Sequence, residues 1–161
     1  MTARGRWASQ PAEGVPDGTI LYDGVCILCS GFVRFVAARD GGRFTFVPVQ
    51  SPWGEAIARR HGISPDMPET NAVVLGGTIH FKSDAGMAVL GTLPGWGWAR
   101  AGRMLPKPLR DWLYDRVARN RYRLFGRTET CELPPPGLRA RVRTEVPADL
   151  AALGIRTVPR P

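Results

Sequence analysis

Two cysteines, Cys26 and Cys29, are the residues of this sequence whose type and spacing could carry out chemistry. They follow Asp23 and Gly24, where a β-prone run gives way to a helical pattern. At the N-cap of a helix, free backbone N–H groups and the positive end of the helix dipole favour a thiolate and lower its pKa from the ordinary value of ~8.5. We therefore predict that Cys26 is a nucleophile presented to solvent and that Cys29, in the first turn beneath it, is the resolving thiol.

Asp23, three residues before Cys26, is a further candidate residue, and two interpretations of it are open. With a raised pKa, its carboxyl group could relay the proton of a buried Cys29 when that thiol resolves a mixed disulfide. Alternatively, the side chain simply caps the turn before the helix. Its negative charge also opposes thiolate formation at Cys26.

The same cysteine pair could instead hold a metal, because two cysteines at this spacing also occur in zinc sites. A zinc site needs four ligands, and the further candidates are Cys131, His61 and His80. The sequence has no second pair at this spacing, and the flanks of Cys131, Thr130 and Glu132, offer no cationic activation. A zinc-binding or interaction module with a basic docking helix is therefore the alternative to a redox pair.

Hydrophobic patterning predicts an α/β domain whose elements alternate β-α-β-α-β-β-α. The pair Gly76 and Gly77 permits the tight turn of a hairpin between the last two strands. The expected strands cover residues 19–22, 44–47, 71–75 and 78–82, and the expected helices cover residues 26–39, 51–61 and 83–93.

A further helix is expected after this core, packed on it as an appendage. Its apolar positions share one face: Leu109, Trp112, Leu113 and Val117.

Residues 100–127, which include this helix, are the most basic part of the chain, with nine Lys and Arg residues against two Asp. Such an excess indicates an acidic partner or an anionic surface. Arginines interleaved with aromatic residues also occur in nucleic-acid-binding segments, but a solvated helix face explains them more simply, so nucleic acid is not the expected partner. Trp96, Trp98 and Trp112 are compatible with a membrane interface, and core packing is their simpler explanation.

The length of 161 residues and the hydrophobic content of 43% suit one globular domain, which we place at residues 18–131. Residues 1–17 have the composition of a flexible lead-in, and residues 132–161 that of a mobile tail rich in Pro and Arg. We find no secretory signal and no run long enough to span a membrane, so the cytoplasm is the expected compartment.

Residues 23–29, Asp-Gly-Val-Cys-Ile-Leu-Cys, resemble the signature of the DCC family of thiol-disulfide oxidoreductases, also described as the DUF393 or YuxK-like family. The resemblance implies a thioredoxin-like fold with Cys26 and Cys29 as the redox pair and Asp23 as the third motif residue. Further stretches that are similar to members of this family, in the same order, are residues 46–51, 83–85, 93–95 and 120–127, followed by Cys131.

The sequence departs from ordinary thioredoxins in two places. Ile27 and Leu28 replace the usual Gly-Pro between the cysteines, and no Thr-Pro dipeptide precedes the strand that begins at Asn71. Pro68 lies three residues before the place where such folds keep a cis-proline.

The expected function is a cytoplasmic oxidoreductase that needs no bound cofactor and exchanges its disulfide with a protein or small-molecule thiol.

Overall fold

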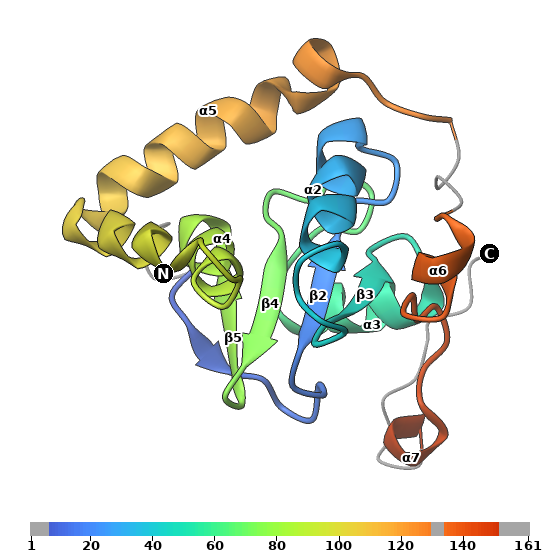
Figure 1. Cartoon of the computed structure of the whole chain (residues 1–161). Coiled ribbons are helices and arrows are strands. Elements are labelled where there is room, and N and C mark those ends of the chain that lie inside the picture. The colour runs from blue at the N-terminus through green and yellow to red at the C-terminus, as the bar shows by residue number, and fades with distance from the viewer. Residues whose placement is uncertain (1–6, 130–133, 152–161) are drawn as a thin grey trace.

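The computed structural model describes residues 7–129 and 134–151, which form a mixed sheet flanked by helices (Figure 1). The five strands of the sheet are β1 (Gln10–Pro11), β2 (Thr19–Tyr22), β3 (Thr45–Pro48), β4 (Ala72–Leu75) and β5 (Thr78–Phe81). They lie in the order β1-β5-β4-β2-β3. β2 runs parallel to β3 and antiparallel to β4, and β5 is antiparallel to both of its neighbours.

The α-helices of the described residues are α2 (Ile27–Ala37), α3 (Pro52–Arg60), α4 (Lys82–Leu90), α5 (Lys107–Phe125), α6 (Pro136–Arg139) and α7 (Ala148–Ala151). A 3₁₀ helix, η1 (Gly97–Met104), precedes α5. From β2 to α4 the elements follow one another in the predicted order β-α-β-α-β-β-α. The fold is thus mixed α/β and compatible with a thioredoxin-like family. None of the helices in residues 7–129 and 134–151 is long and apolar enough to cross a membrane.

The sheet carries a hydrophobic cluster on each face, because successive side chains of a strand point to opposite sides. Leu21 belongs to the cluster that α3 covers, whereas its neighbour Ile20 belongs to the cluster that α2 and α4 cover. Cys26 and Cys29 are members of this second cluster. The predicted redox pair therefore lies on the α2 side of the sheet.

The segment before β2 is packed against the sheet, whereas its composition predicts a flexible lead-in. β1 pairs with β5, and Trp7 and Val15 are buried. The ring of Trp7 lies 5.4 Å from that of Phe81, measured between centroids. A few apolar side chains thus fix residues 7–17, while residues 1–6 lie outside the described part of the chain.

The beginning of the predicted tail is likewise attached to the sheet. Phe46 in β3 donates its N–H to the carbonyl of Arg141 and accepts from the N–H of Arg143, each at 2.8 Å. Leu138 is buried in the cluster on the α2 side. These main-chain bonds order part of residues 132–161, and the rest of that segment includes positions outside the described residues.

Helix α5 crosses the top of the domain in Figure 1. Its pattern predicts that the apolar face packs on the core, and this prediction is wrong. The apolar residues expected to share one face do so, but that face is exposed to solvent; they are Leu109, Trp112, Leu113 and Val117. Toward the domain the helix presents polar side chains instead, among them Asp115, whose carboxylate lies 2.7 Å from Nζ of Lys82. The inner face is polar because it supplies hydrogen bonds and ion pairs to the elements beneath it.

Candidate active site

Cys26 occupies the N-cap of α2, as the sequence predicts. Its backbone is extended, with φ −86° and ψ 121°, and its Sγ accepts a hydrogen bond from the backbone N–H of Cys29 at 3.4 Å. β2 ends at Tyr22, so the loop between strand and helix places the thiol at the carboxyl end of a central strand. The helix N-terminus therefore contributes to thiolate stabilisation at Cys26.

The two cysteines have opposite protonation preferences. A hydrogen bond from the Cys29 thiol lowers the pKa of Cys26 to about 6, with help from the Cys29 N–H and the charge of Arg121, although burial and the charge of Asp23 act against the shift. The same thiol–thiolate bond, together with burial, raises the pKa of Cys29. At neutral pH the pair thus holds one thiolate, on Cys26, and one thiol, on Cys29.

Cys26 is completely buried, which corrects the prediction that solvent reaches it. Residues 126–128 follow α5 and pair with the turn that carries Cys26, and we call them the strap. The Gly126 carbonyl accepts from the N–H of Ile27 at 3.5 Å, and the N–H of Thr128 donates to the carbonyl of Val25 at 2.9 Å. Cys26 itself is bridged to the strap in antiparallel fashion. Because Cys26 has no exposed surface, a substrate can reach its sulfur only if neighbouring groups move.

Asp23 is buried and accepts hydrogen bonds from four groups. Two are local: the N–H of Val25 at 3.2 Å and Nε2 of Gln50 at 2.7 Å. The other two come from α5: Nη2 of Arg121 at 3.1 Å, and the hydroxyl of Tyr122 in a short hydrogen bond. Burial and this bond raise the pKa of Tyr122 to about 12. Asp23 thus caps its turn, as one of the two interpretations predicts, and also joins that turn to α5.

Arg121 is the main contact between α5 and the loop that carries the cysteines. Its guanidinium pairs with Asp23 and also donates to the carbonyl of Pro68 at 2.9 Å. Within residues 7–129 and 134–151 every peptide bond is trans, including the one before Pro68. Near the site, Pro68 therefore contributes its backbone carbonyl as a hydrogen-bond acceptor for Arg121.

Asn71 and Tyr114 complete the surroundings of the second thiol. The Sγ of Cys29 lies 3.9 Å from Oδ1 of Asn71, and the N–H of Asn71 donates to the Tyr114 hydroxyl at 2.9 Å. Burial raises the pKa of Tyr114 to about 12. Sequence reasoning assigned neither residue to the site, nor Gln50, Arg121 and Tyr122. The available signal was the family resemblance of residues 46–51 and 120–127, which contain three of these five residues.

The structure gives the zinc interpretation no support. His61 packs against Phe81, in the cluster on the other side of the sheet from the cysteines. His80 has its Nδ1 2.8 Å from the hydroxyl of Ser9. Among residues 7–129 and 134–151 no three His, Cys, Asp or Glu side chains lie together as a metal site would require, and Cys131 is outside the described residues.

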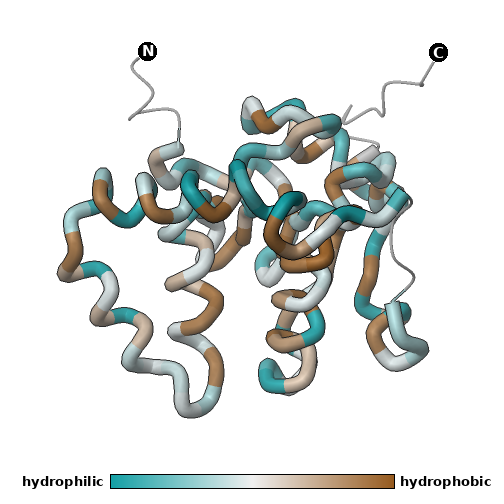
Figure 2. The backbone as a smooth tube through the Cα atoms, turned by 90° about the horizontal axis from the view of Figure 1, so that it is seen from above, coloured by the Kyte–Doolittle hydropathy of each residue, from teal (hydrophilic) through white to brown (hydrophobic). Residues whose placement is uncertain are grey.

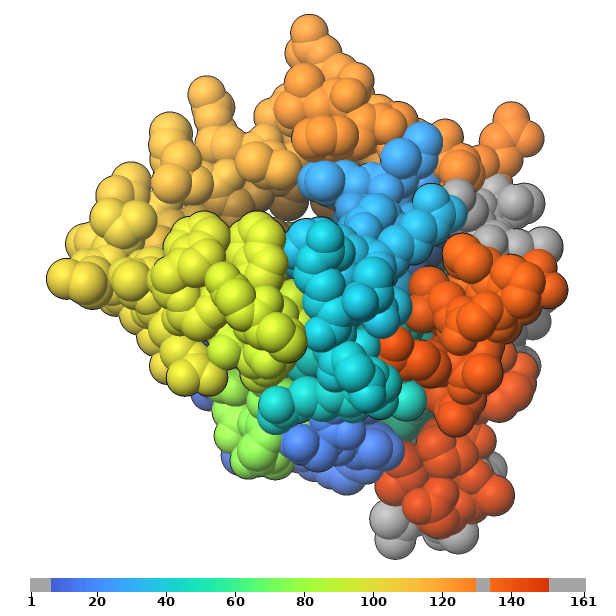
Figure 3. All heavy atoms as spheres, in the orientation of Figure 1, coloured from blue at the N-terminus to red at the C-terminus, as the bar shows by residue number. Residues whose placement is uncertain are grey.

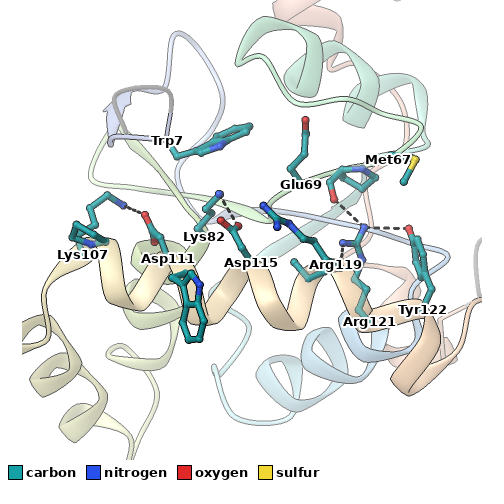
Figure 4. Close-up of a pocket in the computed structure, with 14 residues that line it drawn as sticks. Trp7, Met67, Glu69, Lys82, Lys107, Asp111, Asp115, Arg119, Arg121 and Tyr122 are labelled. Atoms are coloured by element: carbon teal, nitrogen blue, oxygen red, sulfur yellow. Dashed lines mark hydrogen bonds and ion pairs between the residues drawn. The ribbon is translucent and has the colours of Figure 1, made fainter. Parts of the chain in front are cut away.

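A pocket of about 660 Å³ lies next to this network, between α5 and the loop before β4 (Figure 4). Arg121 and Tyr122 form one end of it. Ion pairs from Lys82 and Lys107 to carboxylates of α5 lie along its length, and Arg119 points into it. Two of the residues that hold Asp23 therefore also line this pocket.

Comparison with known proteins agrees with this geometry. The sequence profile of the DCC1-like thiol-disulfide oxidoreductases matches residues 20–127. The chain belongs to the DCC1-like thiol-disulfide oxidoreductase family. It is 35% identical to the uncharacterized protein YuxK of Bacillus subtilis over 81% of this chain and 96% of that protein. It is also 38% identical to a chloroplastic DCC family protein of Arabidopsis thaliana, over 71% of this chain and 68% of that protein. No solved structure matches the chain.

The region shared with the DCC1-like family contains the whole site. It begins within β2, includes the Asp23 turn and both cysteines, and ends at Arg127 in the strap. Helix α5 therefore lies within the region that the family profile covers.

Proposed function

We propose that this protein is a thiol-disulfide oxidoreductase of thioredoxin-like fold, with Cys26 as nucleophile and Cys29 as resolving thiol. The observation that carries the proposal is the position of Cys26 at the N-cap of α2, with its Sγ 3.4 Å from the backbone N of Cys29 one turn later. In this arrangement the pKa of Cys26 is lowered and that of Cys29 is raised. Thiol-disulfide exchange uses this difference in protonation. The thiolate is the form that attacks a disulfide, and the second thiol reacts only after the mixed disulfide has formed.

In the reductive direction, the Cys26 thiolate attacks one sulfur of a substrate disulfide, and the other substrate sulfur leaves as a thiolate. Cys29 then loses its proton and attacks the Cys26 sulfur of the mixed disulfide, which releases the second substrate thiolate. The substrate gains two electrons and the protein holds a Cys26–Cys29 disulfide. The reverse sequence oxidises a dithiol, and neither direction needs a bound cofactor.

Asp23 supports this chemistry as a positioning residue in our proposal. Its contacts with Arg121 and Tyr122 hold the turn before Cys26 against α5. None of its four hydrogen-bond donors described above is a cysteine thiol, which favours the anchoring role over a proton relay.

In this proposal the substrate is a protein or small-molecule thiol or disulfide. The domain that carries the activity spans residues 18–131. The cytoplasm is the expected compartment, because a reducing environment maintains the dithiol form that attacks disulfides.

The test is a redox titration of the full chain in dithiothreitol buffers of increasing oxidised fraction, with free thiols trapped by alkylation and located by mass spectrometry. We expect one reversible two-electron transition assigned to Cys26 and Cys29. Replacing either cysteine by Ser should abolish it, whereas Cys131→Ser should leave it in place. Failure to form the Cys26–Cys29 disulfide reversibly would reject the proposal. Stoichiometric zinc that is lost in Cys29→Ser would favour the metal-binding alternative.

A further inference from the structure

Helix α5 turns its apolar side away from the domain, which is unusual for a helix at the surface of a globular protein. Figure 3 shows the helix as a ridge along one edge of the molecule, with side chains standing out from it. Trp112 is 54% exposed, Leu113 49% and Leu124 66%. The other large exposed apolar residues of the helix are Leu109, Val117 and Phe125. Exposed apolar side chains gathered along one helix in this way are typical of a binding surface.

The charges of the same surface have one sign. The exposed charged residues of α5, all of which the structure describes, are Arg116, Arg119 and Arg123, and of these Arg119 points into the pocket (Figure 4). Both carboxylates of the helix are turned toward the domain, where Asp111 pairs with Lys107 at 2.9 Å and Asp115 with Lys82 at 2.7 Å. In Figure 2, which looks down on α5, hydrophobic and hydrophilic residues alternate along the helix. The outer face thus combines apolar side chains with arginines and has no negative charge.

We propose that the outer face of α5, defined by Leu109, Trp112, Leu113, Arg116, Val117, Arg123 and Leu124, binds the surface of a membrane that contains anionic lipids. A bilayer interface accepts both features at once, because leucine, valine and tryptophan side chains enter the boundary of the acyl chains while arginines stay at the phosphates. Anionic headgroups supply the negative charge that the face lacks.

Other occupants of this face fit its chemistry less well. A second copy of the chain would bring two rows of arginines together with no carboxylate between them, which is unfavourable. A nucleic acid would pair with the arginines but would leave the leucine and valine side chains in water. An acidic protein would need its own apolar strip between its carboxylates. The guanidinium of Arg116, 5.4 Å from the centre of the Trp112 ring, shows how closely the two kinds of side chain are combined on this face.

The test is cosedimentation of the full chain with phosphatidylcholine vesicles, with and without phosphatidylglycerol as about one third of the lipid. We expect binding to the anionic vesicles at low salt and little to the neutral ones, with a loss of binding as salt screens the headgroups. Replacing Arg116 and Arg123 together by Gln should weaken binding roughly thirtyfold. Leu113→Ser with Val117→Ser should weaken it roughly tenfold or more while the net charge stays the same.

The matched control is Arg43→Gln with Arg59→Gln. Both arginines are exposed and lie away from α5, and the two substitutions change the net charge by the same amount as those in α5. In this control variant, binding to the anionic vesicles should weaken less than roughly threefold. Equal losses in the two arginine pairs, or no preference for anionic vesicles, would overturn the proposal. So would a dimer in solution that Leu113→Ser with Val117→Ser converts to a monomer, since the face would then bind a second copy. The redox titration of all these variants should match that of the unmodified chain, so failure here is distinct from failure of the proposed function.

Discussion

The Cys26 thiolate depends more on its partner thiol than on the helix end. The hydrogen bond from Cys29 is the largest influence on the pKa of Cys26, and the backbone N–H of the same residue adds to it. A side chain at position 29 that cannot donate would remove the first influence and leave the second. We therefore expect residue 29 to influence the reactivity of residue 26, in addition to the resolving role proposed for it.

We expect Cys29→Ala to raise the pKa of Cys26 from about 6 toward the ordinary thiol value. Cys29→Ser should cause a smaller rise, because its hydroxyl can still donate to the thiolate. Thiolate absorbance near 240 nm, followed against pH in a Cys131→Ser background, measures the shift. In the unmodified site the thiolate appears as pH rises through about 6 and is complete below the pH where an ordinary cysteine ionises. Coincident titration curves for the Ala variant and the parent would show that the helix end alone sets the pKa.

Asp23 and Arg121 form a buried ion pair, and removing one partner should destabilise the fold. We expect Asp23→Asn to lower the free energy of unfolding by about 3 to 5 kcal/mol, because Arg121 would remain buried without its counter-ion. Urea unfolding of the reduced protein measures this. Arg121→Met combined with Asp23→Asn should cost less than the sum of the two single changes.

Glu13→Gln provides the comparison, because its ion pair with Arg60 is exposed. It should change the free energy of unfolding by less than about 1 kcal/mol. A similar loss from Asp23→Asn and Glu13→Gln would mean that the buried network does not hold the loop.

At the scale of elements, the strap pairs with the Cys26 turn, and we expect it to control access to the site. It is short, it follows directly on α5, and it is held to the Cys26 turn by main-chain hydrogen bonds. Gly126 joins it to the helix with φ 93° and ψ 167°, a backbone conformation that only glycine adopts readily. A Cβ at this position would also lie 3.0 Å from Cδ1 of Ile27. Closure of the strap therefore depends on this glycine.

We expect Gly126→Ala to increase the rate of Cys26 alkylation about tenfold, because backbone strain of a kcal/mol or more would favour the open strap. The rate is measured in a Cys29→Ser, Cys131→Ser background, in which Cys26 is the remaining thiol. Gly62→Ala is the control: Gly62 also has positive φ, at 74°, and a Cβ there would meet nothing within 4 Å. Equal acceleration in both variants would indicate general loosening and not opening of the strap.

At the scale of the whole molecule, polar contacts attach α5 to the domain. Asp84 in α4 accepts from Lys107 and Arg110, each at 2.8 Å, and Ser83 donates to Asp111 at 2.5 Å. Burial alone would raise the pKa of Asp84, but the hydrogen bonds from Arg110 and Lys107 outweigh it and lower the pKa. The attachment of α5 should consequently respond to pH before the apolar core does.

A carboxyl group with a lowered pKa stabilises the folded state above its unfolded pKa of ~3.9 and loses this contribution as pH falls through the folded value. Hydrogen exchange of residues 107–125, corrected for the intrinsic rate, should therefore show lost protection in acid while residues 72–81 remain protected. Asp84→Asn should lower the protection of α5 at neutral pH and reduce its dependence on acid. Simultaneous loss of protection in both segments would show that α5 is not a separate unit.

The sequence alone determined the features that depend on neighbouring residues. The position of Cys26 at a helix start, the order of elements from β2 to α4 and the hairpin at Gly76 and Gly77 follow from local propensity, capping and turn chemistry, which act over a few residues. The approximate bounds of the strands followed from the same patterns.

Only the tertiary structure decided which distant side chains meet at the site. Asp23 and Arg121 are 98 residues apart, and no periodicity within α5 reveals that its polar side must face the domain to reach that carboxylate. The burial of Cys26 was likewise decided by the tertiary structure, in which residues 126–128 pair with a turn far from them in the sequence. Hydrophobic patterning assumes that apolar residues turn inward, and it fails where buried polar groups need partners that only a distant helix supplies.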